Sequence, residues 1–429
     1  MTSRFAVLSC IGVLTAAGVV AASVARRGEP EASPAGKASA AAAVPEPPLK
    51  DSWLGRGVDW LARAQHEDGG WGAGSSARQD IRDARVVQTD PATTAFAGLA
   101  LIRAGNTPTA GAYRENVQRA VGYIVAAVES SGDGPTVTSL TGTQPQAKMG
   151  PLVDTSLTVQ FLSRVVPMIP ASDPLRAKAD AALDKALGKL QKSQESNGEW
   201  GRGGWANALQ GSLGTVALEM AKSAGKEVPA ESLARARATQ QRRLDPGTGR
   251  ADASGAAGVE LYAWAGAARN SAAQSAAARK FMDDAKADGR LEKDAEISEA
   301  NLEVAGAPAP EAAMLSDAYK VSAAQATRLA DDALLGGFGN NGGEEFLSYM
   351  MTSEALVMRG GEEWTKWHAK MDGLLQKVQS ADGSWTGHHC ITSPVFCTAA
   401  VVQTMTADRD VEHLRSQQKT GTANPASAR

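Results

Sequence analysis

The feature that most constrains the fold of this chain is an internal repeat that occurs three times. In each copy, apolar residues at helical spacing lead to a glutamine, which is followed by Asp-Gly or Asn-Gly and then by a tryptophan. Such a unit cannot bury its apolar side alone, so stacking against its neighbours is the stable arrangement. The three copies occupy residues 57–71, 186–200 and 374–385.

Each shared residue of the repeat has a physical role at the end of a helix. A glycine after Asp or Asn supplies the positive φ with which the chain leaves the helix. The glutamine amide can reach backbone groups that a helix end leaves without partners. The tryptophan is a large apolar anchor with one N–H to satisfy, and we expect it to pack on the neighbouring repeat. The shared residues are Gln65, Gly69 and Trp71, then Gln194, Gly198 and Trp200, then Gln379, Gly383 and Trp385.

Weaker copies of the unit occupy the gaps between the three strong ones. Asp133-Gly134 keeps the turn, Gln240 keeps the glutamine, and Asp288-Gly289 keeps only a turn after Phe281. Each turn leads into a second segment rich in small and apolar residues, which predicts a second helix packed against the first. These second segments begin near Asp90, Asp154, Trp205, Ala256, Phe346 and Pro394.

The composition agrees with a helical chain. Aromatic residues make up only 5% of the sequence and alanine is abundant, whereas strands favour aromatic and β-branched residues. The repeat therefore predicts an all-α fold over residues 51–406, an α/α toroid built as a double ring of about six helical hairpins. We expect polar outer helices and small-residue inner helices that line a central cavity.

The repeat resembles the Gln-Trp motif of squalene–hopene and oxidosqualene cyclases and the related repeat of protein prenyltransferase β-subunits. Complement-type thioester domains use the same barrel. The resemblance extends from about Ser52 to Met405 and is clear in the three strong copies. It implies the toroid fold but says little about chemistry, because function depends on the site and not on the scaffold.

The catalytic motifs of these families are absent from the chain. Resemblance to the cyclases implies an Asp-x-Asp-Asp motif whose carboxyl group protonates an alkene or epoxide. The nearest positions hold one carboxylate each, Asp90 and Asp154, and a single Asp before a helix is expected to cap it. The Asp-x-Cys zinc pair of the prenyltransferases and the Gly-Cys-Gly-Glu-Gln motif of the thioester domains are also missing. The chain is therefore interpreted as a divergent relative.

The most unusual chemistry lies in residues 385–398, where two of the five histidines stand beside a cysteine. His388 and His389 are candidates for acid–base catalysis. His388 with Cys390 is a candidate zinc site, since imidazole and thiolate suit Zn²⁺. Adjacent ligands without a distant partner make a poor tetrahedron, so a disulfide between Cys390 and Cys397 is the preferred prediction. Free or merely packed thiols are the next alternative, ahead of a metal site. No cofactor is expected unless the zinc site forms.

A second candidate lies in the apolar segment that follows Gly342-Gly343. Tyr349 and Glu354 have roughly helical spacing and are candidate catalytic residues, because a Glu that faces the cavity could act with a raised pKa. The alternative is a solvated Glu at the outer edge of the helix. Glu344 and Glu345 stand at the helix start, where acidic side chains complement the macrodipole, and are interpreted as structural.

The two ends of the chain do not belong to the predicted toroid. An uncharged stretch over residues 5–25 predicts a signal peptide, or an uncleaved membrane anchor, within residues 1–25. A Pro/Ala-rich linker over residues 26–50 follows and opens with Arg26-Arg27, which would hinder export and favour retention or an inverted orientation. We expect an exported protein, periplasmic or extracellular, with membrane attachment through residues 5–25 as the alternative. Residues 407–429 are expected to be disordered.

Two functions remain open. The net charge of -3, with basic and acidic residues mixed, gives no reason to expect a nucleic-acid partner. The first function is a non-enzymatic toroid that binds an apolar or extended small-molecule ligand in its cavity, or a protein partner on its rim. The second is a divergent enzyme with His388 and Cys390 at the cavity mouth, acting on an isoprenoid or polyprenyl lipid, or on a glycan as a polysaccharide lyase.

Overall fold

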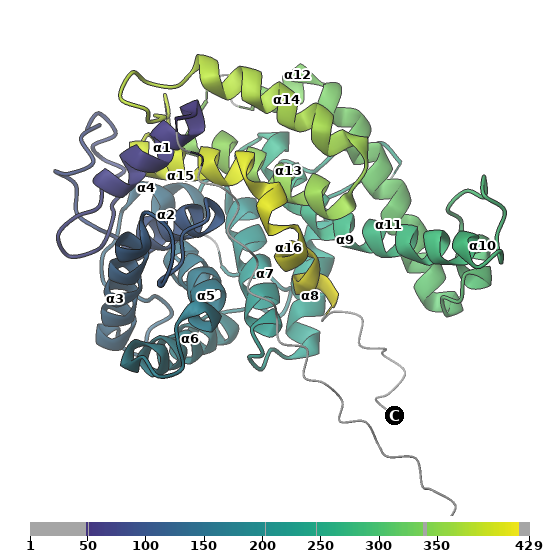
Figure 1. Ribbon diagram of the computed structural model, residues 1–429, viewed down its shortest axis with the longest axis horizontal. Helices are drawn as coiled ribbons and strands as arrows, with labels where there is room; N and C mark the ends of the chain where they lie inside the picture. Colours follow the sequence, from purple (N-terminus) through teal and green to yellow (C-terminus); the bar gives the residue numbers. More distant parts are fainter. Residues whose placement is uncertain (1–48, 50, 202, 246, 338–340, 420–429) are drawn as a thin grey trace, which may run out of the picture. The chain divides into compact units, whose positions relative to one another are not determined.

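The computed structural model describes residues 49, 51–201, 203–245, 247–337 and 341–419. The predicted signal peptide or anchor and nearly all of the linker lie outside these residues. The described residues all belong to one compact unit. In its described part the regular structure is helical, with two isolated β-bridges and no strand (Figure 1).

Within the described residues, six inner helices form a closed ring (Figure 1). Each packs against the next in chain order, and the last packs back against the first. The inner helices are α2 (Pro91–Arg103), α5 (Val153–Val165), α7 (Asn207–Ser223), α9 (Glu260–Ala287), α13 (Gly343–Arg359) and α15 (Pro394–Met405).

An outer helix precedes each inner helix and covers the ring, so the predicted α/α toroid is confirmed. The outer helices are α1 (Trp53–Arg63), α3 (Arg114–Ser130), α6 (Pro174–Lys192), α8 (Ala230–Arg242), α11 (Ala309–Thr327) and α14 (Glu362–Lys377). The connections and the end of the chain hold the short helices α4 (Gln144–Met149), η1 (Val166–Met168), α10 (Glu299–Val304), η2 (Arg328–Ala330), α12 (Asp332–Leu335), η3 (Ala407–Asp410) and α16 (Val411–Lys419).

The tryptophan of each strong repeat is tied to the end of its own outer helix. Its indole N–H donates to the backbone carbonyl ten residues earlier, which satisfies the one polar group of a buried ring. The acceptor in each case is a carbonyl in the last turn of the helix, where intrahelical partners run out. The three bonds run from Trp71 to Leu61 (2.8 Å), from Trp200 to Leu190 (2.9 Å) and from Trp385 to Leu375 (2.8 Å).

The glutamine of each strong repeat links one outer helix to the next. Its amide nitrogen donates to a backbone carbonyl at or near the start of the following outer helix, and its oxygen accepts from an arginine three residues further on. The amide nitrogens reach Asn116 from Gln65 (2.9 Å), Ser232 from Gln194 (3.0 Å) and Trp53 from Gln379 (2.8 Å), and the arginines are Arg119, Arg235 and Arg56.

The glycine of the turn is required by a close approach as well as by its backbone. Gly383 has φ 98°, and a Cβ there would lie 2.8 Å from the carbonyl oxygen of Arg56. Only glycine adopts this conformation without strain. The close packing of this turn against the backbone of Arg56 therefore requires glycine at position 383.

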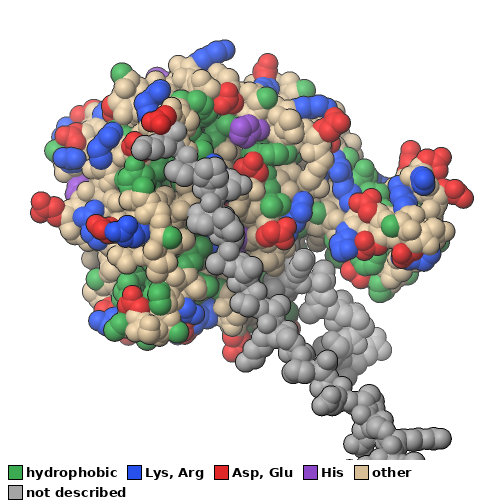
Figure 2. Space-filling view, in the orientation of Figure 1, with side chains coloured by type: hydrophobic (Ala, Val, Ile, Leu, Met, Phe, Trp, Pro, Cys, Tyr) green, Lys and Arg blue, Asp and Glu red, His purple; other side chains and the backbone are tan. Residues whose placement is uncertain are grey.

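One of the weaker repeat copies is not an outer helix. Phe281 lies inside α9, and Asp288-Gly289 ends that helix. The fifth outer helix is α11 instead. The last part of α9 leaves the ring and packs with α10 and α11 around a small separate core of Met282, Leu302 and Leu315. We call residues 278–315 the extra segment, and Asp and Glu side chains are prominent on it in Figure 2.

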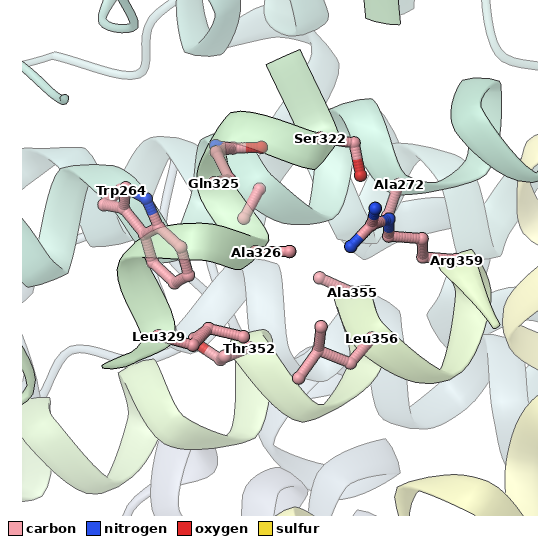
Figure 3. A pocket seen from close by; sticks show the side chains of 11 residues that line it. Trp264, Ala272, Ser322, Gln325, Ala326, Leu329, Thr352, Ala355, Leu356 and Arg359 are labelled. Carbon is pink, nitrogen blue, oxygen red and sulfur yellow. The ribbon is translucent and has the colours of Figure 1, made fainter. Parts of the chain in front are cut away.

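The inner helices pack closely within the described residues, in contrast to the open central cavity expected from the sequence. Every residue of α2, α13 and α15 is buried, and Phe96 stacks on Phe396 with ring centroids 4.6 Å apart. One pocket of about 10 Å³ lies between α9, α11 and α13, where Trp264, Gln325 and Arg359 line it (Figure 3). A second pocket offers about 20 Å³. Each volume suits about one water molecule.

The residues after α15 differ from the prediction of disorder. Residues 407–419 form η3 and α16, and Leu414 and Gln417 are each only 1% exposed. A segment that buries side chains against the ring gains enough contacts to order itself. None of the described helices is long and apolar enough to cross a membrane.

Candidate functional site

All six inner helices begin at one end of the ring, because each follows an outer helix that runs in the opposite direction. Contacts between helix starts agree with this. The backbone N–H of Ala92 in α2 donates to Asp154 in α5 (3.1 Å), and that of Leu152 before α5 donates to Gln210 in α7 (2.9 Å). We call this end the N-terminal mouth. Helix starts present unpaired N–H groups and positive dipole ends there, which favour acceptors.

Two buried aspartates at the mouth have different structural roles. Asp90 caps α2 as predicted, since its carboxylate accepts from the backbone N–H of Thr93 (2.7 Å) and of Ala73 (2.9 Å). Asp154 is not a cap. It lies inside the first turn of α5, and its carboxylate joins α2 to α4 by accepting from Ala92 and from the amide of Gln146 (2.7 Å). Burial raises the pKa of both carboxyl groups.

A second acidic pair stands at the start of α13. Glu345 has a structural role at the helix start, as predicted, because it accepts from the backbone N–H of Gly342 (2.8 Å), which is the N-cap residue of α13. It also accepts from the hydroxyl of Tyr262 (2.5 Å). Glu344 is only 2% exposed. Burial, and to a lesser extent the negative charge of the neighbouring Glu345, raises the pKa of Glu344 to about 7. Its carboxylate accepts from the backbone N–H of Ile391 (3.2 Å).

Cys390 adjoins Glu344 in an unusual backbone conformation. Its φ is 58°, in the left-handed region that a residue with a Cβ seldom adopts, and its thiol donates to Glu344. Backbone strain of this kind is frequent at functional sites. Burial, together with the charge of Glu344, raises the pKa of the thiol to about 11. Cys390 is therefore protonated at neutral pH and is a poor nucleophile in this state.

The predicted disulfide is not formed in the structure. Cys390 and Cys397 are both free thiols, and the buried sulfur of Cys397 lies 3.7 Å from the carbonyl oxygen of Ile391. The described residues also contain no group of three His, Cys, Asp or Glu side chains that could hold a metal ion. His388 is exposed, and the Nε2 of half-buried His389 lies 3.9 Å from Glu345. The geometry therefore does not support zinc at His388 and Cys390.

An exposed tryptophan marks the rim of the mouth. Trp205, in the loop before α7, is 70% exposed. The ammonium group of Lys148 lies 5.0 Å from the centre of its ring, which is a cation–π distance. The positive charge of Lys148 also opposes, in part, the rise in the pKa of Glu344. We call Lys148, Trp205, Glu344 and Cys390 the mouth cluster.

The two other predicted catalytic residues lie elsewhere. Glu354 is buried near the C-terminal end of α13, where it accepts from Arg103 (2.6 Å) and Arg269 (2.8 Å). Burial alone would raise its pKa, but the two arginines outweigh burial and lower the pKa. Glu354 is thus neither a solvated edge residue nor a raised-pKa acid. The hydroxyl of Tyr349 donates to Leu335 (2.7 Å), and its ring packs on Trp367 of the outer layer.

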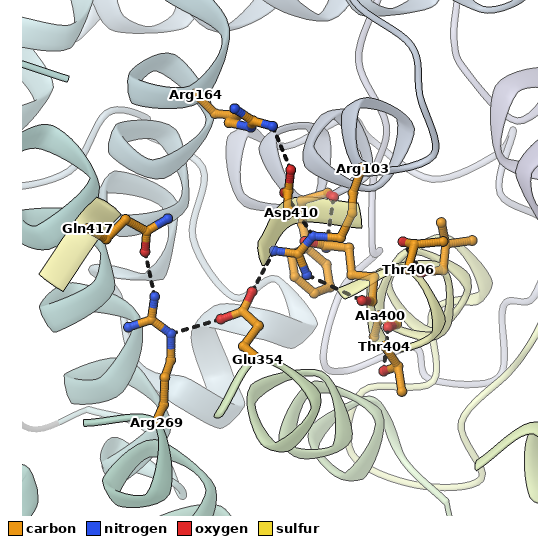
Figure 4. A network of polar contacts seen from close by, with 12 residues as sticks. Arg103, Arg164, Arg269, Glu354, Ala400, Thr404, Thr406, Asp410 and Gln417 are labelled. Atoms are coloured by element: carbon orange, nitrogen blue, oxygen red, sulfur yellow. Dashed lines mark hydrogen bonds and ion pairs between the residues drawn. The ribbon is translucent and has the colours of Figure 1, made fainter. Parts of the chain in front are cut away.

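Glu354 belongs to a buried ion-pair network at the C-terminal end of the ring (Figure 4). The network also contains Asp410 of η3, which accepts from Arg103 (3.1 Å) and Arg164 (2.6 Å). Sequence reasoning missed it because its members come from separate repeats. The one local signal is an arginine near the end of several inner helices, and a cation there is also what the helix dipole favours. The four predicted catalytic residues therefore do not form one site.

Comparisons with known proteins agree with this fold. Residues 37–143 match the family model of the squalene-hopene cyclase C-terminal domain. The resemblance to the squalene-cyclase and prenyltransferase repeat proteins is thereby confirmed over that part of the chain, and the fold is an α/α toroid. No curated protein matches the sequence.

One solved structure that is similar to this chain is an inactive variant of the alpha-1,6-mannanase GH76A of Salegentibacter sp. HEL1_6 in complex with alpha-1,6-mannotriose. Its sequence identity to this chain is 10% and the TM-score is 0.48, over 84% of this chain and 100% of the other. A likeness of this degree carries no argument about function.

Proposed function

We propose that this chain is an exported toroid protein that binds an extended polar ligand, a glycan strand, at its N-terminal mouth. The observation that carries the proposal is Trp205, a large aromatic side chain left 70% exposed on the rim beside Lys148. A flat apolar ring stacks well on the apolar face of a sugar. A neighbouring ammonium group, with three donors, suits hydroxyl groups.

The packing of the ring interior favours a ligand on the mouth over a ligand inside the ring. The two pockets offer about 10 and 20 Å³, whereas pockets for small-molecule ligands are typically about 300 Å³ or more. An isoprenoid chain would need the inner helices to separate. A strand laid across the rim needs no such change, since Trp205 and the half-buried Lys148 are already accessible.

Acid–base catalysis at the same mouth is a second candidate function. Glu344 favours it, because a carboxyl group with a pKa of about 7 can both donate and accept a proton near neutral pH. The strained backbone of Cys390 beside it points to the same place. Glu344 is only 2% exposed, so this function requires the loop that carries Cys390 to move before substrate can reach the carboxyl group.

Affinity electrophoresis tests the binding proposal. The purified chain without its first 50 residues is run in native gels that contain a neutral, an acidic or an amino-sugar polysaccharide, with dextran, alginate and glycol chitosan as probes. We expect at least one of them to retard the protein and Trp205→Ala to abolish the retardation. Met314→Ala is the matched control, since Met314 is an exposed apolar side chain, 42% exposed, on the extra segment.

Two results would overturn the proposal. The first is that none of the polysaccharides retards the protein. The second is that Trp205→Ala and Met314→Ala are retarded equally. A stable complex with a protein partner that depends on Trp205, with no retardation by any glycan, would assign the rim to protein recognition instead. Loss of one aromatic anchor is expected to cost about 2 kcal/mol of binding free energy, roughly thirtyfold in Kd.

A further inference from the structure

The C-terminal end of the ring carries more positive than negative charge from its own helices. In the described part of the chain, toroid helices contribute four arginines to the ion-pair network and only two carboxylates. The arginines are Arg103, Arg164, Arg237 and Arg269, and the carboxylates are Glu219 and Glu354. Buried charges of one sign require partners of the other, and the ring alone provides two fewer anionic than cationic groups in this network.

The third carboxylate comes from outside the ring. Asp410 belongs to η3, which follows the last inner helix, and its two oxygens accept separately from Arg103 (3.1 Å) and Arg164 (2.6 Å) (Figure 4). These arginines come from two different inner helices, α2 and α5. The Asp410 side chain is only 8% exposed. Burial alone would raise its pKa, but Arg164 and Arg103 outweigh burial and lower it, so the group is an anion at neutral pH.

The segment that carries Asp410 lies across the end of the ring. Helix η3 packs on α2, α13 and α15, and α16 packs on α7 and α13. Its largest apolar anchor is Leu414, which is 1% exposed. Ala407 and Val411 also pack against the apolar core. The segment makes polar contacts with the ring as well. They include a 2.6 Å bond from Arg269 to Gln417 and a 3.1 Å bond between Ser223 and Ser416. Polar contacts of this kind can be exchanged for contacts with solvent or with another polar ligand.

A pocket adjoins the carboxylate. It offers about 20 Å³ and is lined by Arg103, Arg164, Asp410 and His413, among others. The Nε of Arg164 has no hydrogen-bond partner there. Arg164 is also the least buried of the inner-helix arginines in the network, with 21% of its side chain exposed. The guanidinium group therefore has donor capacity left beyond its bond to Asp410.

We propose that this arginine cluster is a carboxylate-binding site that the chain's own Asp410 fills, with residues 407–419 as a lid. A carboxylate fits because the planar guanidinium presents paired N–H groups that match two carboxylate oxygens. The C-terminal ends of the inner helices attract cations and repel anions, so only the arginines can hold an anion there. When the lid opens, a carboxylate ligand can replace Asp410. This inference is independent of the function proposed for the opposite mouth.

Chemical rescue by acetate tests the proposal in the full chain. Asp410→Ala removes the internal carboxylate, so Arg164 loses its ion-pair partner and Arg103 keeps only Glu354. We expect the midpoint of thermal unfolding to fall by about 4–6 °C. Sodium acetate should then raise the midpoint of Asp410→Ala above its value in sodium chloride of equal ionic strength, because acetate enters the vacated site. Asp408→Ala is the matched control, since Asp408 is an exposed carboxylate in the same helical turn.

Equal effects of acetate and chloride on Asp410→Ala would overturn the proposal, as would equal acetate rescue of Asp408→Ala. If Asp410→Ala does not fold, Asp410→Asn keeps the shape of the side chain, removes its charge and allows the same comparison. A second readout is hydrogen exchange of residues 411–419. We expect faster exchange in the Asp410 variant and slower exchange when acetate is added. Unchanged exchange in that variant would show that Asp410 does not hold the lid.

Discussion

The side-chain amide of Gln379 donates a 2.8 Å hydrogen bond to the backbone carbonyl of Trp53, which joins the last strong repeat to the first helix. Its oxygen accepts from Arg56 at 2.8 Å. The same bond occurs between neighbouring outer helices at Gln65 and Gln194, but only at Gln379 does it link the two ends of the toroid chain. One repeated contact thus serves both to stack the hairpins and to close the ring.

We therefore expect Gln379→Ala to destabilise the ring closure. The change leaves the carbonyl of Trp53 and the guanidinium of Arg56 without this partner, which costs about 1–3 kcal/mol of unfolding free energy. Denaturant unfolding measures the loss, and hydrogen exchange should accelerate in α1. Gln376→Ala is the control, because its amide bonds only to Asp372 on its own helix. Equal losses in the two variants would contradict a role in closure.

Trp385→Phe isolates the contribution of the indole N–H. The ring is fully buried, and its N–H donates to Leu375 at 2.8 Å, so phenylalanine keeps most of the apolar contact but loses the bond and some volume. We expect a loss of about 2–3 kcal/mol in unfolding free energy, from an unsatisfied carbonyl and a small cavity. The exposed Trp205, changed to phenylalanine, should lose less than about 0.5 kcal/mol. Similar losses at both positions would argue against the anchoring role.

Glu344 predicts an unusual pH dependence of stability. Its pKa is raised from the ordinary 4.5 to about 7 in the folded chain, so the folded state binds this proton more tightly than the unfolded state. Stability is then greatest below about pH 4.5, falls as the pH rises toward 7, and is constant above it. The fall is about 3 kcal/mol at most for this group.

Glu344→Gln should flatten that part of the pH profile of unfolding free energy. Asp90 and Asp154 also have raised pKa values, so part of the decline remains in the variant. Asp410 and Glu354 act in the opposite direction, because their lowered pKa values make their stabilisation disappear as the pH falls. The readout is therefore the difference between the variant and the wild type at each pH. If the difference in unfolding free energy is constant from pH 4 to 8, the pKa of Glu344 is not raised in the folded chain.

The state of the two cysteines has a direct measurement. The structure predicts free thiols at Cys390 and Cys397, so the intact mass of the chain without its first 50 residues should show no loss of two hydrogens. In the folded chain at pH 7 both should alkylate slowly, because burial raises the pKa of each thiol. In denaturant both should react at once. An intact mass that is short by two hydrogens would instead support the disulfide predicted from the sequence.

Export is tested separately from the toroid. Residues 1–50 are fused to an alkaline phosphatase reporter that is active only where disulfides form. We expect activity from the fusion and loss of activity when a charged residue replaces Leu14 in the middle of the uncharged stretch. Fractionation distinguishes a cleaved signal from an anchor. Phosphatase activity that persists in both fusions, or is absent from both, would contradict the role given to residues 5–25.

The fold could be predicted because its signals are local. The helical spacing of apolar residues, the positive φ of Gly383 and the anchoring of Trp385 depend on a few consecutive residues, and they recur three times along the chain. The cap formed by Asp90 is local in the same sense. Phe281 misled the repeat assignment because its turn marks the end of a long inner helix, and the sequence does not say where α9 leaves the ring.

The sites were decided by contacts between distant residues. Glu354 and Arg103 are 251 positions apart, and nothing near Glu354 in the sequence distinguishes an ion pair from a solvated edge. Asp154 resembles a cap until α2 and α4 are seen to meet at its carboxylate. The sequence alone determined the helices, their turns and the toroid class, because these follow from short-range sterics and periodicity. Only the tertiary structure decided which charges are buried together, because burial and pairing depend on how the ring closes.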